Sequence, residues 1–189
     1  MPQLDEAADT APPQAKSEVK PGRDLIEAFA DEIRLLAKRE QRGDLASLRR
    51  LDPEQPDAIA FFRIAAKIVP EAGPDRLRRY ARLVQMLALK PDALKPGRLG
   101  SELAAAGVSE ARVQKLLAAR GPALARQLFL VARRLGDDGI LPYRQLAELV
   151  LEPDDSPRAD DVRLRIARDY WRALEPGNGH SDDQPSGRT

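Results

Sequence analysis

The chain has 189 residues, with 31 basic and 30 acidic side chains and a formal net charge of +1 at pH 7. This length fits one domain or two small helical subdomains. The absence of cysteine excludes disulfides, thiolate metal sites and cysteine nucleophiles. The one histidine, His180, lies among Gly, Ser, Asp and Pro residues that would not fix an imidazole, so histidine catalysis is not expected.

The two ends of the chain differ from its middle in composition. Residues 1–22 are rich in Pro, Ala, Asp and Glu, and residues 176–189 in Gly, Ser, Asp and Pro, so both are predicted to be disordered. The start resembles no signal peptide, and no apolar run approaches the length of a membrane span. We therefore expect a cytoplasmic protein with no membrane contact.

Between these ends the apolar residues repeat at helical spacing. Asp24 is predicted to cap a first helix that Gly43 ends. Asp44 is predicted to cap a short second helix, which carries Arg49 and Arg50.

Proline and aspartate mark the next elements. Asp57 is expected to open a third helix that stops at Pro70, and Pro74 a fourth, because proline fits the first helical turn. Residues 90–100 hold two prolines and two glycines, which is typical of a break between helices. We therefore predict an N-terminal subdomain (23–90), a linker (91–100) and a C-terminal subdomain (101–175).

The second half also has the periodicity of helices. One helix is expected from Ser101, a second is capped by Ser109, and a third starts at Gly121 and ends at Gly136.

A helix over 142–150 follows, and Asp160 or Asp161 is expected to begin the last one. No segment alternates as a strand would. The predicted fold class is all-α, a compact bundle of two small subdomains with disordered termini.

One window stands out by its charge. Residues 111–136 contain no acidic residue but six basic ones: Arg112, Lys115, Arg120, Arg126, Arg133 and Arg134. Seven residues separate Arg126 from Arg133, so they share a helix face about 10 Å apart. Such a face suits the regularly spaced phosphates of nucleic acid. The alternative is a solvated helix face in an arginine-rich protein.

Further arginines lie outside this window. Arg49 and Arg50 form one set, and the fourth predicted helix carries Arg76, Arg78, Arg79 and Arg82. On the last helix, Arg163, Arg165, Arg168 and Arg172 are expected to face solvent, whereas Tyr170 and Trp171 are expected in the core. Few aromatic residues could stack bases and no Asn/Gln cluster could read them, so binding should be independent of sequence.

Nothing in the sequence favours catalysis. Acidic pairs fall at predicted caps and turns, the segment Gly97–Gly100 lacks the Lys-Ser/Thr of a P-loop, and no metal-ligand spacing occurs. We predict that the chain is not an enzyme and has no catalytic, cofactor-binding or metal-binding residues and no cofactor.

The order of several short motifs resembles the CasB family, the small subunit of the type I-E Cascade CRISPR surveillance complex. Gln41–Arg50 is similar to its early "GD-x-A-x-LRR" segment, and Val162–Tyr170 to its terminal "WARDFY"-type helix. Five motifs lie between them in the same order: Ala60–Arg63, Leu99–Leu103, Ser109–Arg112, Leu116–Ala119 and Leu141–Leu146. The resemblance covers residues 25–174.

The resemblance implies a non-enzymatic helical subunit with a role in antiviral defence. In the family two copies line the belly of the complex, beside backbone and large subunits. They contact the CRISPR RNA–target heteroduplex and the displaced DNA strand by backbone electrostatics, which stabilises the R-loop. Arg50 and Arg112 match family motifs directly, and Arg76 matches less closely.

The chain also departs from the family pattern. Relatives often place paired arginines where this chain has Phe129 and Leu130, and here Arg126 and Arg133–Arg134 flank that point instead. A tryptophan is common in relatives near position 151, where this chain continues as Glu152–Pro153.

Two hypotheses from different classes follow. The first is the Cascade subunit, which binds nucleic acid through nine residues: Arg49, Arg50, Arg76, Arg112, Lys115, Arg120, Arg126, Arg133 and Arg134. The second is a helical adaptor that binds only protein, its arginines pairing with acidic partner surfaces. A helix-turn-helix regulator is disfavoured because no helix offers a polar face able to read base edges.

Overall fold

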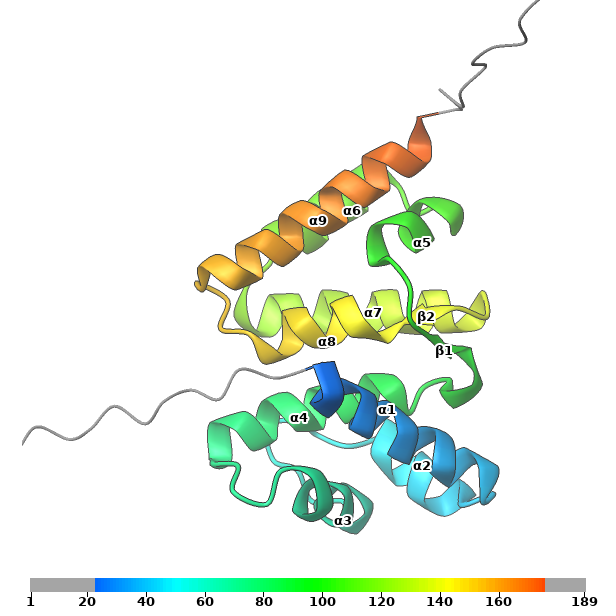
Figure 1. Cartoon of the computed structure of the whole chain (residues 1–189), viewed down its shortest axis with the longest axis vertical. Coiled ribbons are helices and arrows are strands. Elements are labelled where there is room, and N and C mark those ends of the chain that lie inside the picture. The colour runs from blue at the N-terminus through cyan, green and yellow to red at the C-terminus, as the bar shows by residue number, and fades with distance from the viewer. Residues whose placement is uncertain (1–22, 176–189) are drawn as a thin grey trace, which may run out of the picture.

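The computed structural model describes residues 23–175 and consists almost entirely of helices (Figure 1). The predictions for the two ends, 1–22 and 176–189, lie outside the described residues. The first half contains α1 (Arg23–Lys38), α2 (Arg42–Arg49), α3 (Ile59–Ile68) and α4 (Pro74–Leu87). The second half contains α5 (Leu99–Ala105), α6 (Glu110–Ala118), α7 (Gly121–Asp137), α8 (Tyr143–Leu151) and α9 (Pro157–Leu174). The all-α fold class is thereby confirmed.

The helices stack in layers along the long axis of the molecule (Figure 1). α9 lies with α5 and α6 at one end, α7 and α8 form the next layer, and α1 and α4 follow, with α2 and α3 at the other end. α4 packs against α8, and both contribute buried leucines to one continuous core. The two halves of the chain are therefore joined by a hydrophobic contact as well as by the connecting segment.

The connecting segment contains a feature that the sequence analysis missed. A short 3₁₀ turn, η1 (Pro91–Ala93), leads into β1 (Leu94–Lys95), which pairs in parallel with β2 (Leu141–Pro142). Strands of two residues are too short to show an alternating pattern, so periodicity could not reveal them. The pair fixes the segment between the halves against the start of α8.

Several predicted helix boundaries were wrong. α1 ends at Lys38 because Glu40 adopts a positive φ of 52°, and Gly43 lies inside α2. Asp44 does not cap α2; its carboxylate accepts from Arg63 on α3 at 3.0 Å. α3 begins at Ile59 after an Ala58 cap, not at Asp57.

Boundaries in the second half shifted in the same way. α5 starts at Leu99, and α7 continues past Gly136 to Asp137. Ser109 occupies the N-cap position of α6 without a side-chain cap bond. α9 begins at Pro157 because the Ser156 hydroxyl accepts from the Ala159 amide at 3.1 Å, so the expected start at Asp160 or Asp161 was wrong.

α5 and α9 approach each other closely at Gly100. A Cβ atom there would lie 2.1 Å from the Ile166 carbonyl oxygen and 2.6 Å from the Tyr170 nitrogen. At the same contact, the buried Tyr170 donates its hydroxyl to the carbonyl of Val108, in the turn after α5, at 2.6 Å. Trp171, also expected in the core, is instead 38% exposed.

A polar cluster links α1 to α8 across the two halves. The Tyr143 hydroxyl lies 2.6 and 2.7 Å from the two Glu27 carboxylate oxygens and donates to them, and Arg144 donates to Glu27 at 2.9 Å. Arg34 lies 3.5 Å from Glu27 and donates to the Leu94 carbonyl at 3.0 Å. Because the Tyr143 hydroxyl and the Arg144 guanidinium bond to the carboxylate, the pKa of Glu27 lies below its usual value, although partial burial opposes the shift.

We predict opposite effects for two glycine substitutions. Gly100→Ala should cost about 2–4 kcal/mol of unfolding free energy, because the added methyl would collide with the α9 backbone. Gly43→Ala should stabilise the protein by about 0.5–1 kcal/mol, because nothing lies within 4 Å and alanine favours the helix. Urea denaturation of both variants provides the test, and equal effects would contradict the close approach of α5 and α9.

A pH-dependent contribution to stability is expected from Glu27. Its lowered pKa means that the ionised carboxylate stabilises the fold above the ordinary value of 4.5. This contribution should be lost as the pH falls through the lower pKa of the folded state. Glu27→Gln should cost about 1 kcal/mol at pH 7, and the difference from the unsubstituted chain should shrink below about pH 4.5. Urea titrations across this pH range measure it, and a constant difference would contradict the assignment.

Candidate nucleic-acid interface

α6 presents two cations to solvent. Val113 and Leu116 are buried, which places Arg112 and Lys115 on the exposed side of the helix, three residues apart. Neither forms an ion pair within residues 23–175. Both charges are thus available to a partner.

α7 presents a second pair of cations. Its buried residues are Leu124, Leu128, Ala132, Leu135 and Gly136. The exposed stripe on the other side contains Arg126, Leu130 and Arg133, and the two arginines lie about 10 Å apart along the helix axis. They make no ion pair with any residue in the described range. We refer to Arg112, Lys115, Arg126 and Arg133 as the free cations of α6 and α7.

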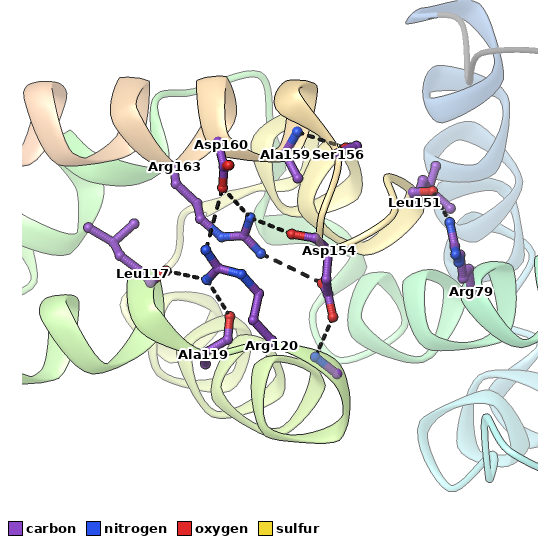
Figure 2. Close-up of polar contacts among 11 residues, drawn as sticks. Arg79, Leu117, Ala119, Arg120, Leu151, Asp154, Ser156, Ala159, Asp160 and Arg163 are labelled. Atoms are coloured by element: carbon purple, nitrogen blue, oxygen red, sulfur yellow. Dashed lines mark hydrogen bonds and ion pairs between the residues drawn. The ribbon is translucent and has the colours of Figure 1, made fainter.

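The other two basic residues of the acid-free window bind within the protein. Arg120 donates to the carbonyls of Leu117 and Ala119 at 2.9 Å and lies 3.4 Å from Asp160 (Figure 2). Arg134 lies 3.4 Å from Asp138, the C-cap residue of α7. Their charges are partly neutralised, so they are weaker candidates than the free cations.

The three basic residues of the N-terminal half that were predicted to bind nucleic acid differ in the contacts that they make. Arg49 donates to the Ala88 carbonyl at 2.6 Å and holds α2 against the end of α4. Arg50 is exposed, and among the residues described its side chain bonds only to its own helix, at the Ala46 carbonyl. Arg76 is half-buried near Tyr80, without an ion pair in the part of the chain described. Arg49 and Arg50 are both exposed, but Arg49 is tied to another helix, so Arg50 is the better candidate to bind a partner.

Sequence analysis missed one basic cluster. Lys38, Arg39 and Arg42 are all exposed at the corner between α1 and α2, and none forms an ion pair with another described residue. The run Lys38-Arg39-x-x-Arg42 could have indicated this cluster. The first helix was predicted to extend to Gly43, and so no corner between two helices was predicted at these residues. Lysine and arginine near a helix C-terminus also complement the helix dipole.

Arg163 was predicted to face solvent, and this was wrong. Its side chain is 7% exposed and lies between α9, α7 and the loop before α9 (Figure 2). It donates to the Asp154 carbonyl and to the Asp160 carboxylate, both at 3.0 Å. The Asp154 carboxylate also accepts from the Gly121 amide at the start of α7. Arg163 and Asp154 therefore anchor the N-terminus of the helix that carries Arg126 and Arg133.

Two observations bear on other classes of function. Within residues 23–175, no group of three or more His, Asp or Glu side chains converges as a metal site would require. No helix in that range is both long and apolar enough to cross a membrane.

The fold and the exposed cations define a small all-helical protein with exposed cations on two consecutive helices, α6 and α7. The family model for CRISPR-associated protein Cse2 matches residues 44–171. The chain therefore belongs to the Cse2 family, the small, non-catalytic structural subunit of type I-E Cascade, also called CasB. This confirms the family that the motifs indicated. Searches of curated proteins and of solved structures returned no match.

We predict that the buried arginine contributes to stability. Arg163→Ala should cost about 2–3 kcal/mol, because it leaves Asp154 and Asp160 without their shared partner and opens a gap beneath α9. Arg168→Ala, an exposed position on the same helix, should change the unfolding free energy by less than about 0.5 kcal/mol. Urea denaturation of the two variants compares them directly, and similar losses would contradict the anchoring role of Arg163.

Proposed function

We propose that this Cascade small subunit binds nucleic-acid backbone through the free cations of α6 and α7 and so stabilises the R-loop in the cytoplasm. The observation that carries the proposal is the set of four exposed cations on two consecutive helices, none of which has an ion pair within residues 23–175. Most other cations of the described region already have acidic or carbonyl partners. A partner rich in phosphates would supply what these four lack.

The ligands of this face are backbone groups rather than base edges. Leu130, 54% exposed, is the residue between Arg126 and Arg133 on the stripe, and it cannot hydrogen-bond to a base. Guanidinium and ammonium groups bind phosphate regardless of sequence. In an RNA-guided complex, base pairing reads the sequence, so CRISPR RNA, target DNA and displaced strand can all use such a face. Arg50, Arg76 and the Lys38–Arg42 corner would extend the path in the N-terminal half.

The exposed apolar side chains supply a different kind of contact. Ile59 and Phe62 lie three residues apart on α3, and Leu164, Trp171 and Leu174 lie along α9. These helices are at opposite ends of the molecule (Figure 1). Exposed apolar side chains of this size are typical of protein interfaces. We propose that they contact the other Cascade subunits, including backbone and large subunits, and a second copy of this chain.

One prediction from the proposed function concerns the salt dependence of nucleic-acid binding. Arg126→Ala with Arg133→Ala should lower the slope of log affinity against log salt by about 1.4 for a single strand, because two phosphate contacts are lost. Arg168→Ala with Arg172→Ala removes the same charge from exposed positions of α9 and should leave the slope unchanged. Equal losses from both pairs would show that net charge alone is responsible.

This measurement applies both to the full chain and to the assembled complex with its CRISPR RNA. If neither binds DNA in a salt-dependent manner, the protein-only adaptor function would replace the one proposed.

Another prediction from the proposed function concerns the assembly of this subunit into the Cascade complex. Leu164→Ser with Trp171→Ser should reduce the amount of this subunit retained in the purified complex, because two exposed apolar side chains are lost from α9. Native mass spectrometry measures the ratio of subunits, and circular dichroism confirms that the variant remains helical. Full retention would contradict a contact through α9. The α9 variant with Arg168→Ala and Arg172→Ala again serves as the control.

A further inference from the structure

A groove runs between the two halves, and Arg126, one of the free cations, lines it. Its volume is about 300 Å³. α4 and the loop before α3 line one side, with Pro53, Glu54, Arg82, Gln85 and Met86, and α7 and α8 line the other, with Pro122, Ala125, Arg126, Phe129 and Val150. A groove of this size is at the lower end of the range for small-ligand sites. It can hold one flat ring system but not a folded peptide segment.

The interior of the groove is apolar and includes one aromatic ring. Met86 and Val150 are buried, Ala125 and Phe129 are half-buried, and all four contribute to its walls. Phe129 is the only aromatic residue lining it in the part of the chain that the structure describes. An aromatic side chain in a water-accessible groove is the usual stacking partner for an unpaired base, because every base has a π face.

The charges at the edge of the groove favour an anionic ligand. Glu54 is ion-paired with Arg82, so these two charges neutralise each other. Arg126 has no such partner among the residues described, and it is one of the free cations of α7. Gln85 donates its amide to the Leu51 carbonyl at 2.7 Å, which leaves its side-chain oxygen free to accept from a ligand.

We propose that this groove takes one unstacked nucleobase of a single strand, with Phe129 stacking on the base and Arg126 binding the adjoining phosphate. The inference rests on the proposed nucleic-acid function and adds a second, uncharged contribution to it. An apolar side chain from another protein would fill the interior equally well. It would leave Arg126 without a counter-charge, however, and so the base is favoured. A duplex would not fit, because its bases are paired and stacked.

The test compares two single strands of the same length, one that carries bases and one that does not. Full-length protein is titrated with a fluorescent oligodeoxythymidylate and with an abasic oligonucleotide of the same length. Phe129→Ala should weaken binding of the thymidylate about 5- to 150-fold, the range for losing one stacked base. It should leave binding of the abasic strand and the salt slope unchanged. Phe62→Ala, at an exposed phenylalanine of α3 that lies outside the groove, is the matched control and should change neither.

A second variant fills the groove without removing a ring from it. Ala125→Phe places a large side chain at a half-buried position of the wall and should weaken thymidylate binding while sparing the abasic strand. Phe129→Trp should retain or strengthen thymidylate binding, which a merely structural role for Phe129 would not predict. Circular dichroism and urea denaturation establish that each variant is folded.

The possible outcomes distinguish a failure of this inference from a failure of the proposed function. Unchanged thymidylate binding by both Phe129→Ala and Ala125→Phe would overturn the proposal that the groove binds a base. The predicted salt response of Arg126 and Arg133 would not be affected by that result. Normal thymidylate binding combined with loss of the variants from the assembled complex would show that the groove docks a protein side chain. Absence of salt-dependent binding by the unsubstituted chain and its complex would overturn the proposed function and the groove together.

Discussion

The burial of one side of α7 determines which charges this protein can offer to a partner. Leu124, Leu128, Ala132 and Leu135 face the core, and a helix has only one opposite side. Arg126 and Arg133 are therefore directed outward by the packing of other residues on the same helix. The network of Arg163, Asp154 and the Gly121 amide fixes where that helix begins (Figure 2). A change in the packing of α7 would thus redirect these two arginines without altering their charge.

The arginines of this chain serve two physical purposes. One group closes the fold: Arg49 reaches the end of α4, Arg79 reaches the Leu151 carbonyl at the end of α8, and Arg163 reaches the loop before α9. Each satisfies a carbonyl that a helix or loop end would otherwise leave without a donor. The other group, on α6 and α7, is exposed and has no ion pair with any residue that the structure describes. The amino-acid composition does not distinguish these two groups of arginines, and only the contacts in the structure show which group each one belongs to.

Much of the fold was predictable because helical periodicity and proline positions are local signals. The Pro74 start of α4 and the separation of α6 from α7 at Gly121 agree with the structure. The errors arose where a residue had two possible roles. Gly43 and Gly136 were interpreted as helix ends, yet both are helical, because Glu40 and Gly139 adopt the positive φ angles near the two ends. Gly136 instead accommodates the side chain of Lys90, which a Cβ would approach to 2.9 Å.

The sequence by itself determined the all-helical class, the family and the acid-free run of cations, because these depend on the order and spacing of residues along the chain. Tertiary structure alone decided which cations are free. Arg120 and Arg163 find acidic partners from segments distant in sequence or across a turn, whereas Arg112 and Arg126 find none between residues 23 and 175. It also decided that Phe129, from the second half, lines one groove with Gln85 from the first. Contacts between distant segments depend on how the helices pack, and no local pattern records that packing.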